Sequence, residues 1–490
     1  MNYKAVLRIN AQVILIETVL MTVPLIICMA DGDSPGFRGF AAAMIIGFVL
    51  SGAALWLTRK AKNNIGARDG FFAVGLAWTL MSLLGALPLF VSNSIPSYVD
   101  AFFEIVSGFT TTGASIIPGE EIASLSRGIL YWRSFTHWLG GMGMLVLLLA
   151  VIPQSGRNGG FSLHILRAES PGPSVGKLVP KMRQTAMILY FCYFALTFLD
   201  TIFLVASPEL SLFDALCLAY GTAGTGGFGL NGHSIGGYSP YVQNVCTVFM
   251  YLFGVNFTLY YYLLMRRVSY IFKDEELRMY LATITLSITV IMINLWRNGI
   301  FSTFGERLRH AAFQVASVMT TTGYTTTDFN EWPSLSKGIM VCLMFMGACA
   351  GSTGGGIKIM RVLLLGKTIR RNTHSLLHPR EVKAIRYNGG VVDERVIENV
   401  QSYMAIYVAI LIFSFILISM DGRFSVLSNA TAVISALNNI GPGLEQVGPS
   451  GNFAGYSVFS KLVLCFDMLA GRLEIFPMLV FFSRSTWKKV

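Results

Sequence analysis

Four short apolar segments of the chain end in the same way, in small or hydroxyl-bearing residues followed by a glycine. Each begins with a polar residue that stands 13 positions before its glycine. Backbone carbonyls arranged in a ring replace the hydration shell of a monovalent cation, and threonine hydroxyls add further oxygens. The residue types and their spacing therefore predict a cation filter. The four segments are DAFFEIVSGFTTTG (100–113), DALCLAYGTAGTGG (214–227), HAAFQVASVMTTTG (310–323) and SNATAVISALNNIG (428–441).

The bound ion is expected to be monovalent, because no ring of carboxylates stands at these positions to attract Ca²⁺ or Mg²⁺. In the second segment two glycines compete for the filter position, and the 13-residue spacing selects Gly227 over Gly226. Each glycine also fits an ordinary helix C-cap, which is the alternative interpretation. Four matched copies favour the filter. The candidate ion-binding residues are Thr111, Thr112, Gly113, Thr225, Gly226, Gly227, Thr321, Thr322, Gly323, Asn439, Ile440 and Gly441.

Helices of this length must position the candidate filter residues from inside a membrane. About 13 residues are too few to cross a hydrocarbon core of about 30 Å as a helix. Irregular backbone at membrane depth is tolerated only where it lines a cavity or is buried in protein. Four such half-helices are expected to converge on one axis, where the partial negative charge at each C-terminal end attracts a cation.

The composition is that of a polytopic membrane protein, with 53% hydrophobic and only 13% charged residues among 490. With the N-terminus placed in the cytoplasm, 27 of the 37 lysines and arginines fall on inner segments and 8 on outer segments. This asymmetry predicts ten spans with both termini inside. The predicted spans are 8–30, 39–58, 70–91, 127–153, 183–206, 240–265, 278–296, 336–366, 399–420 and 456–482.

The predicted fold class is thus an all-α integral membrane protein, with ten transmembrane helices and four re-entrant pore helices. Four pseudo-fourfold repeats of helix, pore loop and helix surround one pore. The net charge of +11 is attributed to this topology and to contact with inner-leaflet lipid, not to nucleic acid. We expect no cofactor in the chain, only a monovalent cation as the transported ion. The seven cysteines lie in apolar runs and are expected to be structural.

Several further stretches carry a family resemblance that covers nearly the whole chain. They are ARDGF (67–71), FTTTGAS (109–115), YWRSFTHWLGGMG (131–143), LRAESPGP (166–173), GACAGSTGGGIKIMR (347–361), LLHPR (376–380), ALNNIGPG (436–443) and MLAGRLEIF (468–476). With these motifs the sequence resembles the Trk/Ktr/HKT superfamily of potassium transporters, and most of all its bacterial TrkH/TrkG branch. The resemblance implies potassium uptake across the bacterial inner membrane, and a glycine at all four filter positions implies potassium selectivity.

The resemblance also implies a division of the chain and a gate. Residues 1–69 would form a two-helix hairpin outside the pore, followed by four repeats at 70–182, 183–275, 276–398 and 399–490. A glycine-rich break in the third repeat would lie beneath the filter as a gating loop, and Arg472 in the last helix would project into the pore. An Arg472–Glu474 pair that braces helices is the alternative, and for Arg133 the structural role is favoured. The predicted gate residues are Gly351, Ser352, Thr353, Gly354, Gly355, Gly356 and Arg472.

Partners follow from the resemblance alone. It implies a homodimer and a separate TrkA-like nucleotide-binding subunit in the cytosol, for which the basic loops 154–183 and 367–396 offer a docking surface. Ion coupling in symport is left open. One alternative is the potassium-translocating subunit of an ATP-driven pump. Another is a membrane enzyme acting on a lipid-linked substrate, against which the sparse intramembrane carboxylates argue, since they show no metal-ligand spacing.

Overall fold

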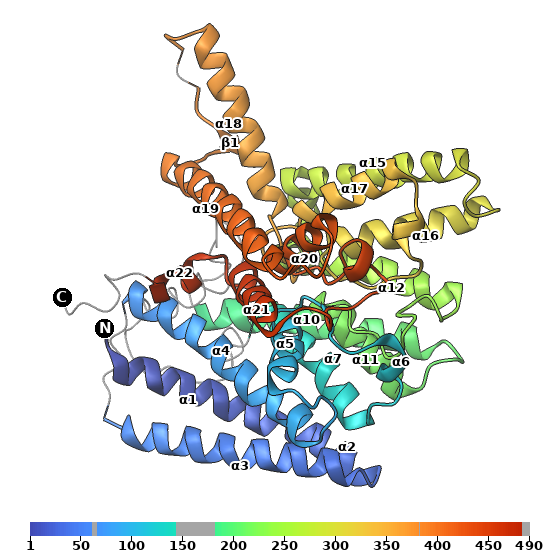
Figure 1. Cartoon of the computed structure of the whole chain (residues 1–490). Helices are drawn as coiled ribbons and strands as arrows, with labels where there is room; N and C mark the ends of the chain where they lie inside the picture. The colour runs from blue at the N-terminus through green and yellow to red at the C-terminus, as the bar shows by residue number, and fades with distance from the viewer. Residues whose placement is uncertain (61–65, 144–181, 382, 483–490) are drawn as a thin grey trace.

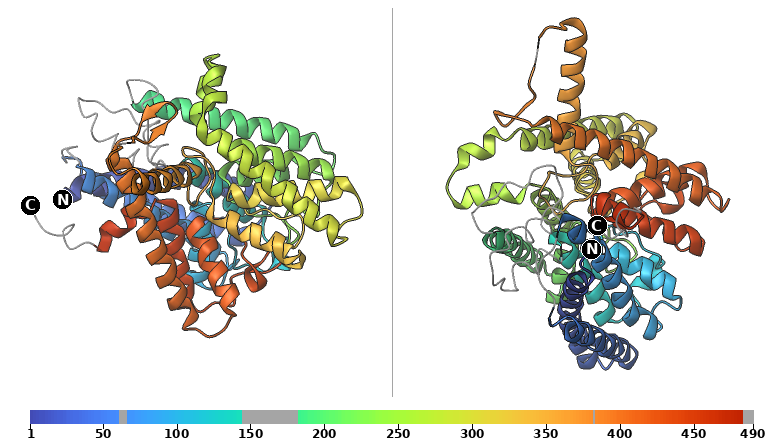
Figure 2. Two further views of the ribbon diagram at one scale, coloured as in Figure 1. Left: turned by 90° about the horizontal axis from the view of Figure 1, so that it is seen from above. Right: turned by 90° about the vertical axis from the view of Figure 1, so that its left-hand side faces the viewer.

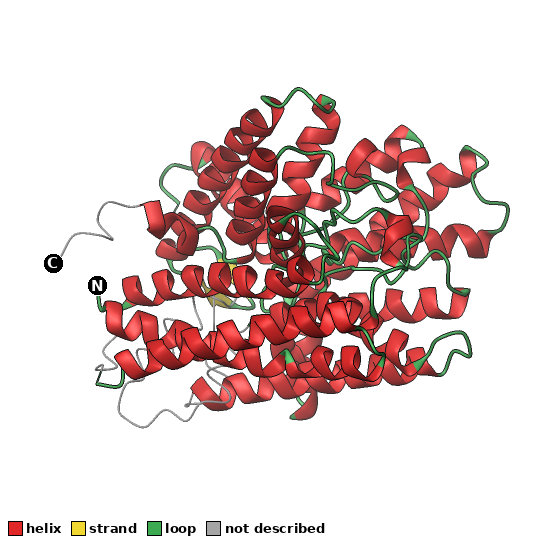
Figure 3. Ribbon diagram, turned by 60° about the horizontal axis from the view of Figure 1, so that its bottom comes forward, coloured by secondary structure: helices red, strands yellow, loops and turns green. Residues whose placement is uncertain are grey.

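The computed structural model describes residues 1–60, 66–143, 182–381 and 383–482. Helices dominate these residues, and the loops between them gather in the middle of the molecule (Figure 3). The predicted end of one span at 144–153, nearly all of the basic loop 154–183 and the motif 166–173 lie outside the described residues. The last residues, 483–490, also lie outside them, so the position of the C-terminus is not described.

The N-terminal helices lie along one edge of the molecule (Figure 1). Small residues allow the close packing there, because a Cβ at Gly47 would overlap Thr18 and one at Gly39 would lie 2.6 Å from the Pro88 carbonyl oxygen. Residues 3–57 therefore form a tight hairpin packed against the next helix. The elements are α1 (Tyr3–Leu20), α2 (Thr22–Ala30), α3 (Ser34–Leu57) and α4 (Ala67–Val91).

Six helical stretches are long and apolar enough to cross a membrane within the described residues. They are Tyr3–Ala30, Ser34–Leu57, Arg68–Val91, Ala186–Val205, Glu275–Arg297 and Glu394–Ser419. The last three belong to α10 (Met182–Val205), α15 (Glu275–Arg297) and α19 (Glu394–Ser419). A seventh span results if the bent pair α12 (Pro240–Phe253) and α13 (Phe257–Leu264), which meet at 89°, is counted as one.

The four segments with terminal glycines form short helices at the expected places. All four begin with a side-chain N-cap, from Ser97, Ser211, Thr303 or Ser425. Three caps stand 16 residues before the glycine, whereas Thr303 stands 20 before it, so the third helix is about one turn longer than expected. The helices are α5 (Tyr98–Phe109), α11 (Leu212–Gly224), α16 (Phe304–Met319) and α20 (Val426–Asn438).

The helices that follow these four segments are shorter than the predicted spans, because each ends or breaks inside its span. α7 ends at Gly143, whose φ of 79° stops the helix. The predicted span 336–366 is divided by an irregular loop at 346–358, and the span 456–482 turns at 473–475. The elements are α7 (Arg127–Met142), α17 (Ser334–Phe345), α18 (Ile359–Leu377), α21 (Val458–Arg472) and α22 (Phe476–Phe482).

The helix α18 projects away from the rest of the molecule (Figures 1 and 2). After it, β1 and β2 form a two-residue antiparallel hairpin, with Arg386 opposite Val391 and Tyr387 opposite Gly390. Among the described residues these are the only strands. The remaining short elements are α6 (Gly119–Ile122), α14 (Val268–Lys273), η1 (Phe329–Glu331), β1 (Arg386–Tyr387), β2 (Gly390–Val391) and η2 (Glu445–Val447).

Candidate functional site

The four glycine-terminated turns, here called the filter turns (110–113, 224–227, 320–323 and 438–441), share one backbone geometry. The residue two places before each glycine is left-handed, with φ between 54° and 58°, and each glycine has φ between 76° and 99°. In each turn the amide before the glycine donates to the carbonyl five residues earlier, at 2.8–3.0 Å. This is a Schellman-type helix end, so each glycine both caps its helix and takes part in a geometry that all four turns share. The left-handed residues are Thr111, Thr225, Thr321 and Asn439.

The left-handed position is strained in three of the four turns. A β-branched residue in this conformation is an outlier, and here the position holds threonine three times and asparagine once. Such strain costs on the order of 1–3 kcal/mol and persists only where the surroundings enforce it. Strain of this kind concentrates at functional sites, so these turns are candidates for such a site.

The filter turns meet in a closed ring. A Cβ at Gly113 would overlap the Gly226 carbonyl oxygen, one at Gly227 the Thr322 oxygen, and one at Gly323 the Ile440 oxygen. The ring closes because a Cβ at Gly441 would lie 2.8 Å from the Thr112 oxygen. Each glycine therefore faces the carbonyl before the next glycine, in the order first, second, third, fourth and back to first. The spacing of 13 residues selected Gly227, and the structure places it in this ring with a φ of 76°.

Side chains behind the ring differ between turns. Thr110 and Thr112 share a hydroxyl–hydroxyl hydrogen bond of 2.8 Å, as do Thr320 and Thr322. In the fourth turn the Asn439 amide donates to the Thr112 hydroxyl at 3.0 Å and to the Met468 carbonyl at 2.8 Å. The Thr111 hydroxyl and the Asn439 Oδ1 have no protein partner among the described residues, so they are acceptors for water or an ion.

A cavity of about 100 Å³ has all four filter glycines in its wall. Residues from the loops 114–122, 228–234 and 442–453 line most of the rest, together with Thr325 and with Arg133 of α7. Its wall is polar at the carbonyl ring, so it offers a hydrated approach to the ring. Three acidic residues that follow the filter turns in the sequence, Glu120, Glu121 and Glu445, do not line this cavity.

On the opposite side of the ring lies the glycine-rich loop, residues 346–358. The Gly355 amide donates to the Thr321 hydroxyl at 2.6 Å. A Cβ at Gly354 would lie 3.0 Å from the Thr320 carbonyl, and one at Gly355 would lie 2.7 Å from the Asn438 carbonyl. The loop thus lies against the third and fourth filter turns, and every residue from 352 to 358 is buried. The predicted loop residues Ser352 and Thr353 are 4% and 0% exposed.

The bend between α12 and α13 provides backbone partners for the loop. The Cys349 amide donates to the Gly254 carbonyl at 3.0 Å, and the Phe257 amide donates to the Gly351 carbonyl at 3.0 Å. A straight helix would satisfy these groups internally, so the bend is what frees them. The predicted span 240–265 is therefore broken at this bend, which the sequence pattern did not indicate.

Two buried charged residues hold the loop and were not singled out from the sequence. Glu276, at 1% exposure, accepts the Ala350 amide at 2.7 Å, within the loop, and the Met360 amide at 3.1 Å, at the start of α18. The Lys358 ammonium donates to the carbonyls of Gly354 and Gly355. Lys358 could have been found from the sequence, because it lies two residues after a glycine run in an apolar stretch and charges at membrane depth are costly.

Arg472 lies against the loop. Its guanidinium donates to the Thr353 carbonyl at 2.7 Å and to the carbonyls of Gly140 and Gly141 at 2.6 Å each. Arg472 therefore connects the loop to the end of α7. The predicted alternative, a pair between Arg472 and Glu474, is not the contact that forms, because Glu474 pairs with Arg361.

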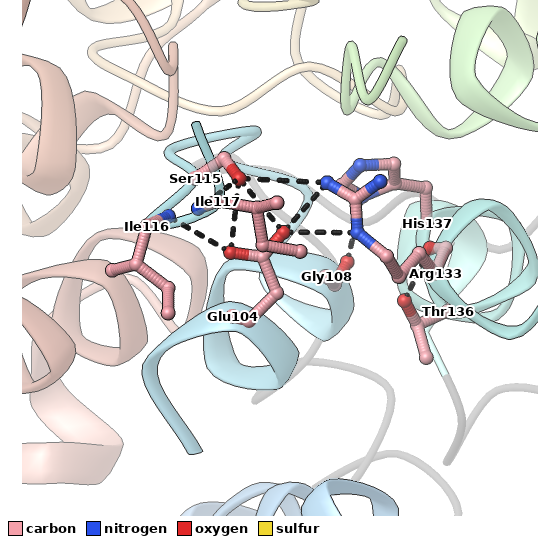
Figure 4. A network of polar contacts seen from close by, with 8 residues as sticks. All are labelled: Glu104, Gly108, Ser115, Ile116, Ile117, Arg133, Thr136 and His137. Carbon is pink, nitrogen blue, oxygen red and sulfur yellow. Dashed lines mark hydrogen bonds and ion pairs between the residues drawn. The ribbon is translucent and has the colours of Figure 1, made fainter. Parts of the chain in front are cut away.

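Arg133 has the structural environment expected for it. Its guanidinium donates to Glu104 through Nε at 2.9 Å and Nη2 at 2.6 Å, and both side chains are almost fully buried (Figure 4). The Glu104 carboxylate also accepts the Ser115 hydroxyl and the Ile116 amide. This network joins α5, α7 and the segment after the first filter turn.

A helical bundle with a ring of backbone carbonyls and a buried loop against it defines a polytopic membrane transport protein. The TrkH family profile, described as a cation transport protein, matches residues 37–489. The Trk system potassium uptake protein TrkH of Escherichia coli K12 is 34% identical over the full length of both chains, and TrkG of the same strain is 33% identical over 92% of this chain and 91% of its own. The crystal structure of the potassium transporter TrkH from Vibrio parahaemolyticus matches with a TM-score of 0.87 at 30% identity and covers both chains completely.

This chain belongs to the TrkH family, within the Trk potassium transporters. The family resemblance inferred from the sequence is confirmed.

Proposed function

We propose that this chain is the membrane subunit of a bacterial potassium uptake system, and that K⁺ passes through the ring of filter turns. The closed order of the four glycines and four carbonyls is the observation that carries the proposal. Oxygens held at fixed positions in such a ring substitute for the hydration shell of K⁺. The relatives are named as Trk system potassium uptake proteins, which favours this function over the subunit of an ATP-driven pump.

The architecture that goes with this function is ten spans and four re-entrant helices in the repeats 70–182, 183–275, 276–398 and 399–490. Four N-capped short helices that end in equivalent turns support the fourfold arrangement. The broken spans support it as well, since α17 and α21 each stop at the loop or at its partner Arg472. The hairpin 1–69 lies outside the pore, and both termini face the cytoplasm of the bacterial inner membrane.

The glycine-rich loop is the gate in this proposal. It lies against the third and fourth filter turns and is held by Glu276, Lys358 and Arg472 through hydrogen bonds. Displacing it requires breaking buried contacts, so the energy must come from outside this segment. A TrkA-like nucleotide-binding subunit in the cytosol supplies that energy, and the transporter works as a homodimer in contact with membrane lipid.

The decisive experiment measures ion flux in proteoliposomes, with wild type beside Gly113→Ser. We expect potassium-selective flux in wild type. The variant is expected to admit sodium, because a side chain at Gly113 displaces the Gly226 carbonyl from the ring. Wild-type flux that is equal for sodium and potassium, measured with the regulatory subunit present, would refute the potassium assignment.

A further inference from the structure

The second filter turn has glycine at two positions where the first and third turns carry threonine side chains. Gly224 and Gly226 stand at the positions that Thr110 and Thr112 hold in the first turn and Thr320 and Thr322 in the third. The hydroxyl pair that closes those two turns is therefore missing here. Some other group must hold the Gly226 carbonyl beside Gly113, or the ring would be loose at this point.

The side chain of His137, on α7, fills the missing space. A Cβ at Gly226 would overlap the imidazole ring, and one at Gly224 would lie 3.0 Å from the His137 Cβ and overlap its carbonyl. The ring centroid lies 4.2 Å from that of Phe228, the residue after the filter glycine. His137 is fully buried, so its ring packs directly behind the filter backbone.

Two anchors fix the orientation of this imidazole. Nδ1 lies 2.8 Å from the Gly108 carbonyl, so Nδ1 carries the proton that this bond requires. One turn earlier on α7, Arg133 is held by Glu104 (Figure 4). Its guanidinium lies 4.3 Å from the centroid of the Phe228 ring. Arg133 and His137 therefore lie on one face of α7, and this face packs against the second filter turn and the residue that follows it.

We propose that His137 is a positioning residue for ion selectivity, which sets the place of the Gly226 carbonyl in the ring. It acts through the backbone and does not touch the ion. The proposal rests on the proposed filter function. It also explains why this turn reads Gly-Thr-Gly-Gly, because a threonine at 226 and an imidazole at 137 cannot occupy the same space.

The first test compares potassium-to-sodium permeability ratios from reversal potentials of reconstituted wild type, His137→Ala and His137→Gln. We expect His137→Ala to lower the ratio about tenfold, since a filter left loose by an ångström loses its discrimination. His137→Gln keeps a donor for Gly108 and should fall in between. The matched control is His310→Ala, which removes a histidine that contacts Phe301 and Thr326 and not the filter turns.

The second test is a rescue. Gly226→Ala alone should lower potassium flux about tenfold or more, because its Cβ overlaps the imidazole. Adding His137→Ala should restore flux to within about threefold of the His137→Ala protein, since the clash is gone. A double variant no better than Gly226→Ala, or a His137→Ala ratio equal to wild type, would overturn the proposal. Wild type without potassium selectivity would overturn the proposed function itself, and this inference with it.

Discussion

The filter ring and the glycine-rich loop lie next to each other but are built in different ways. In the ring, four segments contribute the same pair of backbone conformations and the same hydrogen bond, so the four backbones are nearly equivalent. At the loop the four parts of the chain that carry the filter turns contribute different groups. The first supplies carbonyls of α7, the second a helix bend, the third the loop itself and the fourth Arg472.

This difference fits the roles proposed for the two regions, a filter and a gate. Coordinating a spherical ion requires oxygens at similar distances on all sides, which equivalent segments provide. A gate requires one movable part with fixed partners, and four identical loops would fill the same space. We therefore expect changes in the ring to alter selectivity and conduction together, and changes at the loop to alter the open fraction alone.

The largest effect is expected when the equivalence of the ring is broken. Gly227→Ala puts a Cβ onto the Thr322 carbonyl oxygen and forces alanine to a φ of 76°, which costs about 1–2 kcal/mol by itself. Potassium flux in proteoliposomes should fall about 100-fold. The matched control is Gly338→Ala on α17, where a Cβ meets no atom within 4 Å. Equal loss in both variants would show that the ring is not special.

A smaller effect, of opposite sign, is expected at the loop. Arg472→Ala removes one hydrogen bond to the loop and two to α7, so basal potassium flux without the regulatory subunit should rise about tenfold. Arg472→Lys keeps the positive charge but lacks the planar guanidinium that donates to the carbonyls of the loop and of α7 at the same time. If the lysine variant conducts like alanine, the hydrogen bonds hold the gate. If it conducts like wild type, the charge does. A folded alanine variant with lower flux than wild type would argue against a gate.

The sequence was sufficient to predict the features that repeat within the chain. The polar residue 13 positions before each glycine correctly predicted where the short helices lie. In three of these helices the polar residue is the third residue after the N-cap, namely Asp100, Asp214 and Ser428. The amide of each donates to the side chain of the N-cap, which ties this residue to the start of its helix. The third helix begins one turn earlier at Thr303, so His310 lies inside it and does not take part in a cap.

What the sequence did not predict depends on residues far apart in the chain. Glu276 holds two amides that lie 74 and 84 positions away, and no local pattern marks that pairing. The bend at Gly254–Asn256 lies in a stretch that the apolar pattern predicts as one span. The backbone groups freed by the bend form hydrogen bonds with the loop, which is distant in the sequence. Likewise, the glycines of the second filter turn require the position of His137, which only the folded chain provides.

The role of Glu276 gives a third prediction, smaller than the first two. Glu276→Gln replaces a charged acceptor of two amides by a neutral one, and a hydrogen bond to a charged group is worth about 1.5–3 kcal/mol. The loop should open more often, which native Cys349 reports because it is only 1% exposed. Site-resolved thiol labelling by mass spectrometry should be about tenfold faster in the variant.

The matched control for this prediction is Glu275→Gln, one residue earlier. Glu275 contacts Lys367 and Asn388, not the loop, so the same change of charge should leave Cys349 labelling at the wild-type rate. Equal acceleration in both variants would attribute the effect to α15 as a whole. No acceleration in Glu276→Gln would mean that Lys358 and Arg472 are sufficient to hold the loop.

The smallest effect is expected outside the membrane, where the third and fourth repeats meet. Hydrogen bonds from Ser425 and Ser428 lower the pKa of Glu445 below its ordinary value of 4.5, and the Glu445 amide donates to Asn330 at 2.9 Å. A lowered pKa means that the charged carboxylate favours the folded protein above pH 4.5. That contribution is lost as the pH falls through the lowered pKa. Melting temperatures of wild type and Glu445→Gln should therefore differ slightly at pH 7 and converge below pH 4.5, whereas selectivity stays unchanged, because Glu445 touches neither the ring nor the loop.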